Sequence, residues 1–157
     1  MAKYVIRGDF GISNEIEIIN AINDLNAGID TEIIITHNTG GNAQLAIDLS
    51  RAIFHSSAEK IDVTVEAFAA SAAGFVVMSV GLFCLDKLTL NVPKPCLIIY
   101  HRPRIENRDT GIAYFYLTSS ICIEYDTLMH KWKNTYAVNY NDLQAYYSNH
   151  EFVFLMN

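Results

Sequence analysis

The chain has 157 residues, of which 51% are hydrophobic and 18% are charged, and its formal net charge is −6. This length fits a single domain, residues 1–157, that can bury a substantial core, and the acidic balance without any basic run disfavours nucleic-acid binding. So few charged residues beside so many apolar ones favour an oligomer, in which part of the apolar surface is covered.

Strand and helix patterns alternate along the first eighty residues. We expect strands at Lys3–Arg7, Glu32–Thr36 and Asp62–Glu66, each followed by a helix, at Asn14–Asn26, Ala43–Ser56 and Ser71–Ser79. Ser13 is the expected N-cap of the first helix, and Gly81 is the expected C-cap of the third. Strands and helices of these lengths predict an α/β fold of parallel β-α-β units with right-handed crossovers.

The rest of the chain is expected to add short strands and then helix. The short strands are Leu82–Leu85, Lys87–Leu90 and Cys96–Tyr100. The segment Thr110–Tyr147 has a helical pattern that is interrupted near Tyr136–Asn141.

Two glycines, Gly40 and Gly41, follow the second expected strand. Glycine permits positive φ and a close approach of the backbone. The amides of this turn would therefore suit an extended peptide, a developing oxyanion or a phosphate. Taken alone, the pair indicates only a turn.

Ser71 lies within a run of small residues, at the point where a β-branched strand gives way to a helix. A nucleophile on such a turn could use the next amide, that of Ala72, as an oxyanion donor. The alternative is a buried serine that bonds to its own helix backbone.

The segment Ala67–Leu85 carries no charge and approaches the length of a membrane span. It is rich in alanine and lacks flanking basic clusters and aromatic belts. A helix buried in a crowded α/β core is the better interpretation, so we expect no membrane partner. The apolar run Tyr4–Ile6 is too short for a signal peptide.

The three cysteines are Cys84, Cys96 and Cys122. Cys96 and Cys122 lie in apolar surroundings, which is typical of core thiols in a reducing compartment, and we expect a cytoplasmic protein. No Cys-x-x-Cys or His-x-x-x-His spacing occurs. The sequence therefore predicts no metal site and no cofactor.

His101 ends an apolar strand two residues before Pro103. A histidine at such a strand end can act as a general base with its ring near solvent. The alternative is an ordinary residue at the end of a strand.

The order of these pieces resembles the proteolytic subunit of Clp-type serine proteases. That family typically has an Asn-Ser-Pro-Gly-Gly turn, a Gly-x-Ala-Ala-Ser segment and a Met-Ile-His-Gln-Pro segment. The corresponding pieces here are Asn38–Gly41, Ala67–Ser71 and Ile99–Pro103. The opening strand with its turn at Gly8 also looks similar, so the resemblance covers nearly the whole chain.

The resemblance implies a ClpP/crotonase-like fold of repeated β-α-β units with a projecting helix within the segment after Thr110. It implies a serine endopeptidase in which Ser71 is the nucleophile and His101 the general base. The amides at Gly40, Gly41 and Ala72 would hold the oxyanion. The implied partners are a polypeptide substrate, a homo-oligomeric ring (a heptamer or stacked rings) and, as a further option, an AAA+ ATPase.

The third catalytic residue of the family is an aspartate, and the resemblance assigns its place to Glu151, with Asp109, Asp126 and Asp142 as alternatives. The change from aspartate to glutamate is a departure from the family pattern. Thr39 replaces the turn proline and Ala67 replaces the glycine before the nucleophile. These departures keep open a catalytically inactive homologue with an assembly or scaffold role. A crotonase-like acyl-CoA enzyme is a third hypothesis.

Overall fold

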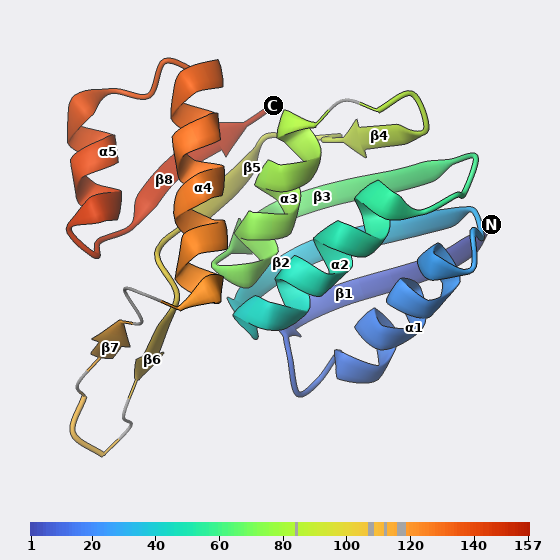
Figure 1. The fold of residues 1–157 in the computed structure, drawn as a ribbon, viewed down its shortest axis with the longest axis horizontal. Coiled ribbons are helices and arrows are strands. Elements are labelled where there is room, and N and C mark those ends of the chain that lie inside the picture. The colour runs from blue at the N-terminus through green and yellow to red at the C-terminus, as the bar shows by residue number, and fades with distance from the viewer. Residues whose placement is uncertain (84, 107–108, 112, 116–118) are drawn as a thin grey trace.

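A sheet of mostly parallel strands runs through the centre of the molecule (Figure 1). The computed structural model describes residues 1–83, 85–106, 109–111, 113–115 and 119–157. The strands of the sheet lie in the order β1-β2-β3-β5-β8, and β4 pairs with the first half of β3. Strand β8 is antiparallel to β5. In chain order the elements are β1 (Ala2–Phe10), α1 (Glu15–Asn26), β2 (Thr31–Gly41), α2 (Ala43–His55), β3 (Ile61–Ala70), α3 (Ala72–Leu82), β4 (Leu88–Asn91), β5 (Cys96–Tyr100), β6 (Arg104–Glu106), β7 (Ala113–Phe115), α4 (Ser120–Thr135), α5 (Tyr140–Tyr147) and β8 (Phe152–Met156).

Helices α1, α2, α3 and α4 lie on one face of this sheet (Figure 1). Strands β1, β2 and β3 are parallel and follow one another across the sheet in a single direction. Because β-α-β crossovers are right-handed, connections that all move in one direction place their helices on the same side. The predicted α/β fold of parallel β-α-β units is thus confirmed.

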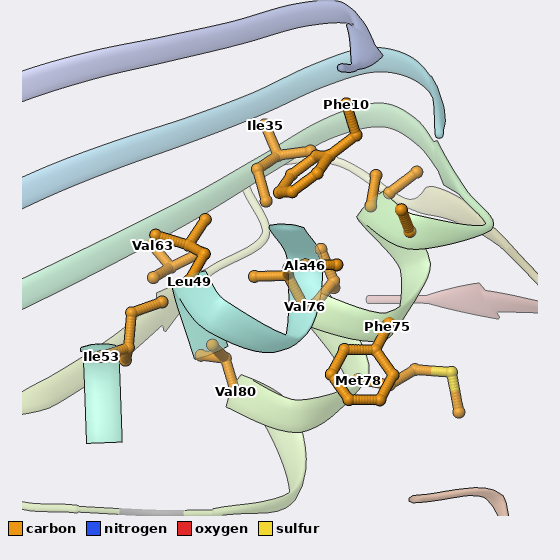
Figure 2. Packing of buried hydrophobic residues seen from close by; sticks show 14 of the residues in the cluster. Phe10, Ile35, Ala46, Leu49, Ile53, Val63, Phe75, Val76, Met78 and Val80 are labelled. Atoms are coloured by element: carbon orange, nitrogen blue, oxygen red, sulfur yellow. The ribbon is translucent and has the colours of Figure 1, made fainter. Parts of the chain in front are cut away.

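Side chains of the strands meet those of α2 and α3 in the core (Figure 2). Helix α3 is apolar on every side and is buried from Ala72 to Val80, as is typical of a helix in a protein interior. It has 11 residues, so its length is about 16 Å at 1.5 Å per residue. Among the described residues, no helix has the length and hydrophobicity needed to cross a membrane. The core residues labelled in Figure 2 are Phe10, Ile35, Ala46, Leu49, Ile53, Val63, Phe75, Val76, Met78 and Val80.

Two predicted helix ends were wrong. Helix α1 has Asn14 rather than Ser13 at its N-cap, and the Asn14 side chain donates to the backbone carbonyls of Arg7 and Asp9 instead of capping the helix. Helix α3 does not stop at Gly81 but continues through Leu82. No strand begins at Leu82, therefore, and Cys84 lies outside the described residues.

The helical prediction for Thr110–Tyr147 was wrong at Ala113–Phe115, which form strand β7. Strands β6 and β7 pair antiparallel into a ribbon that extends away from the sheet (Figure 1). Helix α4 begins only at Ser120, and its buried Tyr125 stacks on Phe75 of α3 with 4.4 Å between the ring centroids. The expected interruption is confirmed, because α4 and α5 are separate helices. In this chain the ribbon, and not α4, is the element that projects.

The prediction that Cys96 and Cys122 lie in the core is confirmed. Cys96 and Cys122 are buried and free of disulfides. Burial raises the pKa of the Cys96 thiol to about 11, which keeps it protonated and unreactive near neutral pH.

Candidate active site

A cavity of about 360 Å³ lies where β2, β3 and β5 reach their carboxyl ends. Ser71, His101 and Gly41 all line it. In open parallel sheets, ligands bind at this edge because the loops that leave the strands surround it. The remaining lining residues are Asn42, Ala43, Gln44, Pro103, Arg104, Ile105 and Ile121. We call this space the Ser71 cavity.

Ser71 occupies a sharp turn between β3 and α3. Its φ is +55°, a conformation that is rare and unfavourable for a residue with a side chain. Two backbone hydrogen bonds hold it there, from Ser71 N to Ile99 O (2.8 Å) and from Phe75 N to Ser71 O (2.9 Å). The hydroxyl does not cap α3. The alternative of a serine bonded to its own helix end therefore finds no support.

The glycine turn packs directly against Ser71. Gly40 has a φ of +89°, and a Cβ at this position would lie 2.6 Å from the Ala70 carbonyl oxygen and 2.6 Å from Ser71 Cβ. Only glycine fits so close to the turn at Ser71. The amide of Gly40 donates to Asn38 Oδ1 at 2.9 Å, so it is already used within the turn. Gly41, and not Gly40, lines the Ser71 cavity.

The amide of Ala72 belongs to the first residue of α3. Amides in the first turn of a helix have no acceptor within the helix, and they carry the positive end of its dipole. This location makes Ala72 N–H a second candidate donor beside Ser71.

Asn38 is buried, and its structural role was not predicted from the sequence. Its Nδ2 donates to the carbonyls of Ile6 (3.2 Å) and Asp9 (2.9 Å), and its Oδ1 accepts from Gly40 N. One side chain thus fastens the glycine turn to the end of β1. The sequence signal that could have found it is an asparagine two residues before the glycine pair.

A bulge distorts β2 and β3 just before the site. The register shifts between Thr36 and Asn38, and two non-glycine residues beside it have positive φ, His37 (+44°) and Ala67 (+63°). Ala67 is the position where the family has glycine. Ala67 thus adopts a left-handed conformation without being glycine, the residue that adopts it most easily.

His101 follows β5, and its Nδ1 lies 2.7 Å from the carbonyl oxygen of Arg102. A carbonyl oxygen can only accept, so in this contact Nδ1 carries the hydrogen. In the neutral imidazole, Nε2 is then the nitrogen that carries no hydrogen. Nε2 is therefore the atom that could take a proton.

Glu151 immediately precedes β8. The β5–β8 ladder ends at the pair Tyr100 and Phe152, so His101 and Glu151 are the residues that adjoin the last pair of the ladder. The side chain is about half exposed, and its Oε1 lies 3.8 Å from Arg104 Nη2. The structure thus brings Glu151 to the same edge of the sheet, but the Nδ1 contact of His101 is with a backbone carbonyl.

The alternative acids have other surroundings. Asp126 on α4 accepts two hydrogen bonds from Arg102 and one from Tyr146, and the hydrogen bond to Asp126 raises the pKa of Arg102. Asp142 bonds to Asn139 at the start of α5. Asp109 lies exposed in the turn between β6 and β7.

Solved structures of ClpP proteases share this fold. A ClpP1 mutant from Listeria monocytogenes matches with a TM-score of 0.58 and 11% identity, over 97% of this chain and 81% of that one. The ClpP protease catalytic domain from Plasmodium falciparum matches with a TM-score of 0.59 and 15% identity, over 99% and 76%. No protein-family model and no curated protein matches the chain. Identities this low establish the fold alone, and the chain has the fold of ClpP proteases.

Proposed function

We propose that this chain is a serine endopeptidase of the ClpP type, with Ser71 as nucleophile and His101 as general base. The observation that carries the proposal is the Ser71 cavity itself. A serine on a strained strand-to-helix turn, a strand-end histidine and a glycine turn line one space at the carboxyl edge of the sheet. These are the parts that acyl transfer requires.

The proposed reaction has two halves. Ser71 Oγ attacks the scissile carbonyl carbon while His101 Nε2 takes its proton, and the imidazolium then protonates the leaving amine. Water next attacks the acyl-enzyme ester, with His101 again as base, and releases the acid. The N–H groups of Gly41 and Ala72 are the proposed donors to the oxyanion, and each such donor contributes about 100-fold or more in rate.

We propose Glu151 as the acid that stabilises the imidazolium. Its position next to the last β5–β8 pair, Tyr100 and Phe152, with His101 on the other strand, supports this role. A carboxylate near the imidazolium stabilises its positive charge even without direct contact. The stabilisation is stronger where bulk water is excluded. Arg104, which pairs with Glu151 and lines the Ser71 cavity, would hold the carboxylate at this edge.

The proposed substrate is a polypeptide in extended conformation. One wall of the Ser71 cavity comes from the glycine turn and the start of α2, and another comes from Arg104 and Ile105 of strand β6. An extended peptide between two such walls can bond to backbone on either side, as peptides do when they add to a sheet edge.

We further propose a homo-oligomer, in the form of a ring. Parallel sheets are normally covered on both faces, but the face opposite the helices carries exposed apolar side chains on β5 and β8. Leu97, Val153 and Leu155 are 38%, 46% and 58% exposed. Light scattering should show a multimer that Leu155→Glu dissociates and that Ile123→Glu, an equally exposed residue on α4, leaves intact. An AAA+ ATPase partner stays a prediction.

Cleavage of a quenched fluorescent peptide library tests the enzymatic proposal. Wild type and the control variant Ser148→Ala, which alters an exposed serine after α5, should cleave at equal rates. Ser71→Ala should form the same oligomer and cleave nothing. A folded, assembled wild type without any cleavage would favour the inactive scaffold, and stabilisation by a coenzyme A thioester would favour the crotonase-like enzyme.

A further inference from the structure

The two residues that flank His101 are both fastened to helix α4. Arg102 Nε donates to Asp126 Oδ1 at 2.9 Å, and Arg102 Nη2 donates to Asp126 Oδ2 at 2.7 Å. On the other side, the Tyr100 hydroxyl donates to the carbonyl oxygen of Tyr125 at 2.7 Å. The two acceptor residues are consecutive on α4. The backbone of His101 is therefore pinned at both ends to one point of one helix.

Helix α5 closes this arrangement from outside. The Tyr146 hydroxyl donates to Asp126 Oδ1 at 2.7 Å. The Tyr100 ring stacks between Tyr125 and Tyr146, with centroid distances of 5.6 and 5.4 Å. All three tyrosine rings are buried, and the Arg102 side chain is only 12% exposed. We call Arg102, Asp126 and Tyr146 the Arg102 clamp.

The clamp has a geometry that resists movement. The planar guanidinium meets both carboxylate oxygens at once, so it sets the direction of the Arg102 side chain as well as its distance from α4. The Arg102 peptide carbonyl, which accepts from His101 Nδ1 at 2.7 Å, moves with that residue. What holds the Arg102 side chain therefore also holds the acceptor of the histidine ring.

We propose that the Arg102 clamp orients His101, so that Arg102 and Asp126 are positioning residues for the general base. This inference rests on the proposed function. The acid of a serine-protease triad both orients the histidine and stabilises its charge. In this chain the two tasks are divided: the clamped carbonyl of Arg102 fixes ring direction and tautomer, and Glu151 supplies the negative charge.

This division of tasks matters because the Arg102 carbonyl sets the tautomer of His101. An unrestrained neutral histidine in water favours the tautomer with hydrogen on Nε2, which cannot accept a proton there. An acceptor held at Nδ1 selects the other form, in which Nε2 carries no hydrogen and can act as the base. If the Arg102 peptide is free to turn, the acceptor leaves Nδ1, and the ring loses both its direction and the useful tautomer.

Arg102→Lys is the first test, because lysine keeps the charge but contacts the carboxylate at a single point. Its matched control is Arg51→Lys, which alters an exposed arginine that pairs with Glu124 on the same helix α4. We expect kcat to fall by about 10- to 100-fold with KM nearly unchanged, as small displacements of catalytic groups do. The rate at which a fluorophosphonate labels Ser71 should fall equally. Arg51→Lys should match wild type in both.

The second readout does not depend on activity. Nitrogen-15 NMR of the His101 ring at alkaline pH, assigned with His101→Gln, should show hydrogen on Nδ1 in wild type and a shift toward the Nε2–H form in Arg102→Lys. Glu151→Gln should slow labelling but leave the tautomer unchanged. If Arg102→Lys does not fold, Asp126→Asn, which keeps the shape of the side chain, takes its place.

The outcomes separate the two proposals. A wild type that is not labelled at Ser71 contradicts the proposed function, and the NMR result still decides whether the clamp sets the tautomer. A wild type labelled at Ser71, with Arg102→Lys unchanged in rate and tautomer, overturns the clamp. A tautomer that shifts in Glu151→Gln instead gives the orienting role to Glu151.

Discussion

Gly40→Ala adds only one methyl group, yet we expect it to disturb the candidate site strongly. Gly40 adopts a φ of +89°, and a Cβ there would lie 2.6 Å from both the Ala70 carbonyl oxygen and Ser71 Cβ, and 3.1 Å from Ala72 N. None of these atoms belongs to a flexible side chain that could move aside. A methyl group at Gly40 must therefore displace the turn that carries the nucleophile.

The magnitude has two parts. A left-handed conformation costs a non-glycine residue about 1–2 kcal/mol, and forcing an extra methyl group into a packed site costs about 1–3 kcal/mol. Gly40→Ala should thus lower the free energy of unfolding by about 2–5 kcal/mol. A shift of Ser71 by about 1 Å should also slow its reaction with a fluorophosphonate by about 100-fold.

Gly8→Ala is the matched control. Gly8 has nearly the same φ, +90°, but a Cβ at this position would have no atom within 4 Å beyond its own chain neighbours. This variant should lose only the conformational part, about 1–2 kcal/mol, and label at the wild-type rate. Urea denaturation measures both free energies of unfolding. Equal losses for Gly40→Ala and Gly8→Ala, with equal labelling rates, would refute the close packing of the turn on Ser71.

Three further changes test separate parts of the structure. Ala67→Gly should leave thermal stability equal or higher, because glycine relieves about 1 kcal/mol of strain at φ +63°, whereas Ala27→Gly, at φ −82°, should lower it by about 0.5–1 kcal/mol. Asn38→Ala should lower the free energy of unfolding in urea by about 3 kcal/mol, because three buried hydrogen bonds around the Gly40 turn are lost; a loss below that of an exposed Asn→Ala would contradict this. Burial raises the pKa of the Cys96 thiol to about 11 from an ordinary value near 9. The stability that the protonated thiol contributes is therefore complete below pH 9 and is lost as the pH rises to 11. The free energy of unfolding should fall over that range by up to about 1.4 kcal/mol per pH unit. Cys96→Ala should show a shallower fall over that range, and an identical slope would argue against a buried thiol.

Local sequence pattern was enough to predict the β-α-β body of the fold. Strand β5 has the predicted ends, Cys96–Tyr100, and helix α2 differs from its prediction by one residue. Both segments have a clear apolar pattern and are preceded by turn-forming residues, a proline before β5 and the glycine turn before α2. The strand-to-helix turn at Ser71 was predictable for the same reason, since residue types change abruptly there.

Elements that depend on distant contacts were not predictable in this way. Strands β6 and β7 have three residues each and exist through their pairing with one another, which no local pattern records. The short apolar run after Gly81 suits a strand or the last turn of a helix equally well, and in the folded chain the helix extends to Leu82.

The site shows the same division between residue identity and side-chain geometry. Ser71, His101 and Gly41 were named from the sequence, and they line one cavity. The bond from Gly40 N to Asn38 and the contact of His101 Nδ1 with Arg102 O depend on rotamers. The pairing of Arg102 with Asp126 joins residues 24 positions apart, and a sequence alone does not show which of several acids an arginine selects.

A crystal structure of the protein after reaction with a fluorophosphonate tests the central claim most directly. The account predicts a phosphonyl group on Ser71 Oγ, with its free oxygen accepting from the N–H groups of Gly41 and Ala72 and with His101 Nε2 beside Oγ. A label on any other residue, or a phosphonyl oxygen that no amide of this turn reaches, would contradict it.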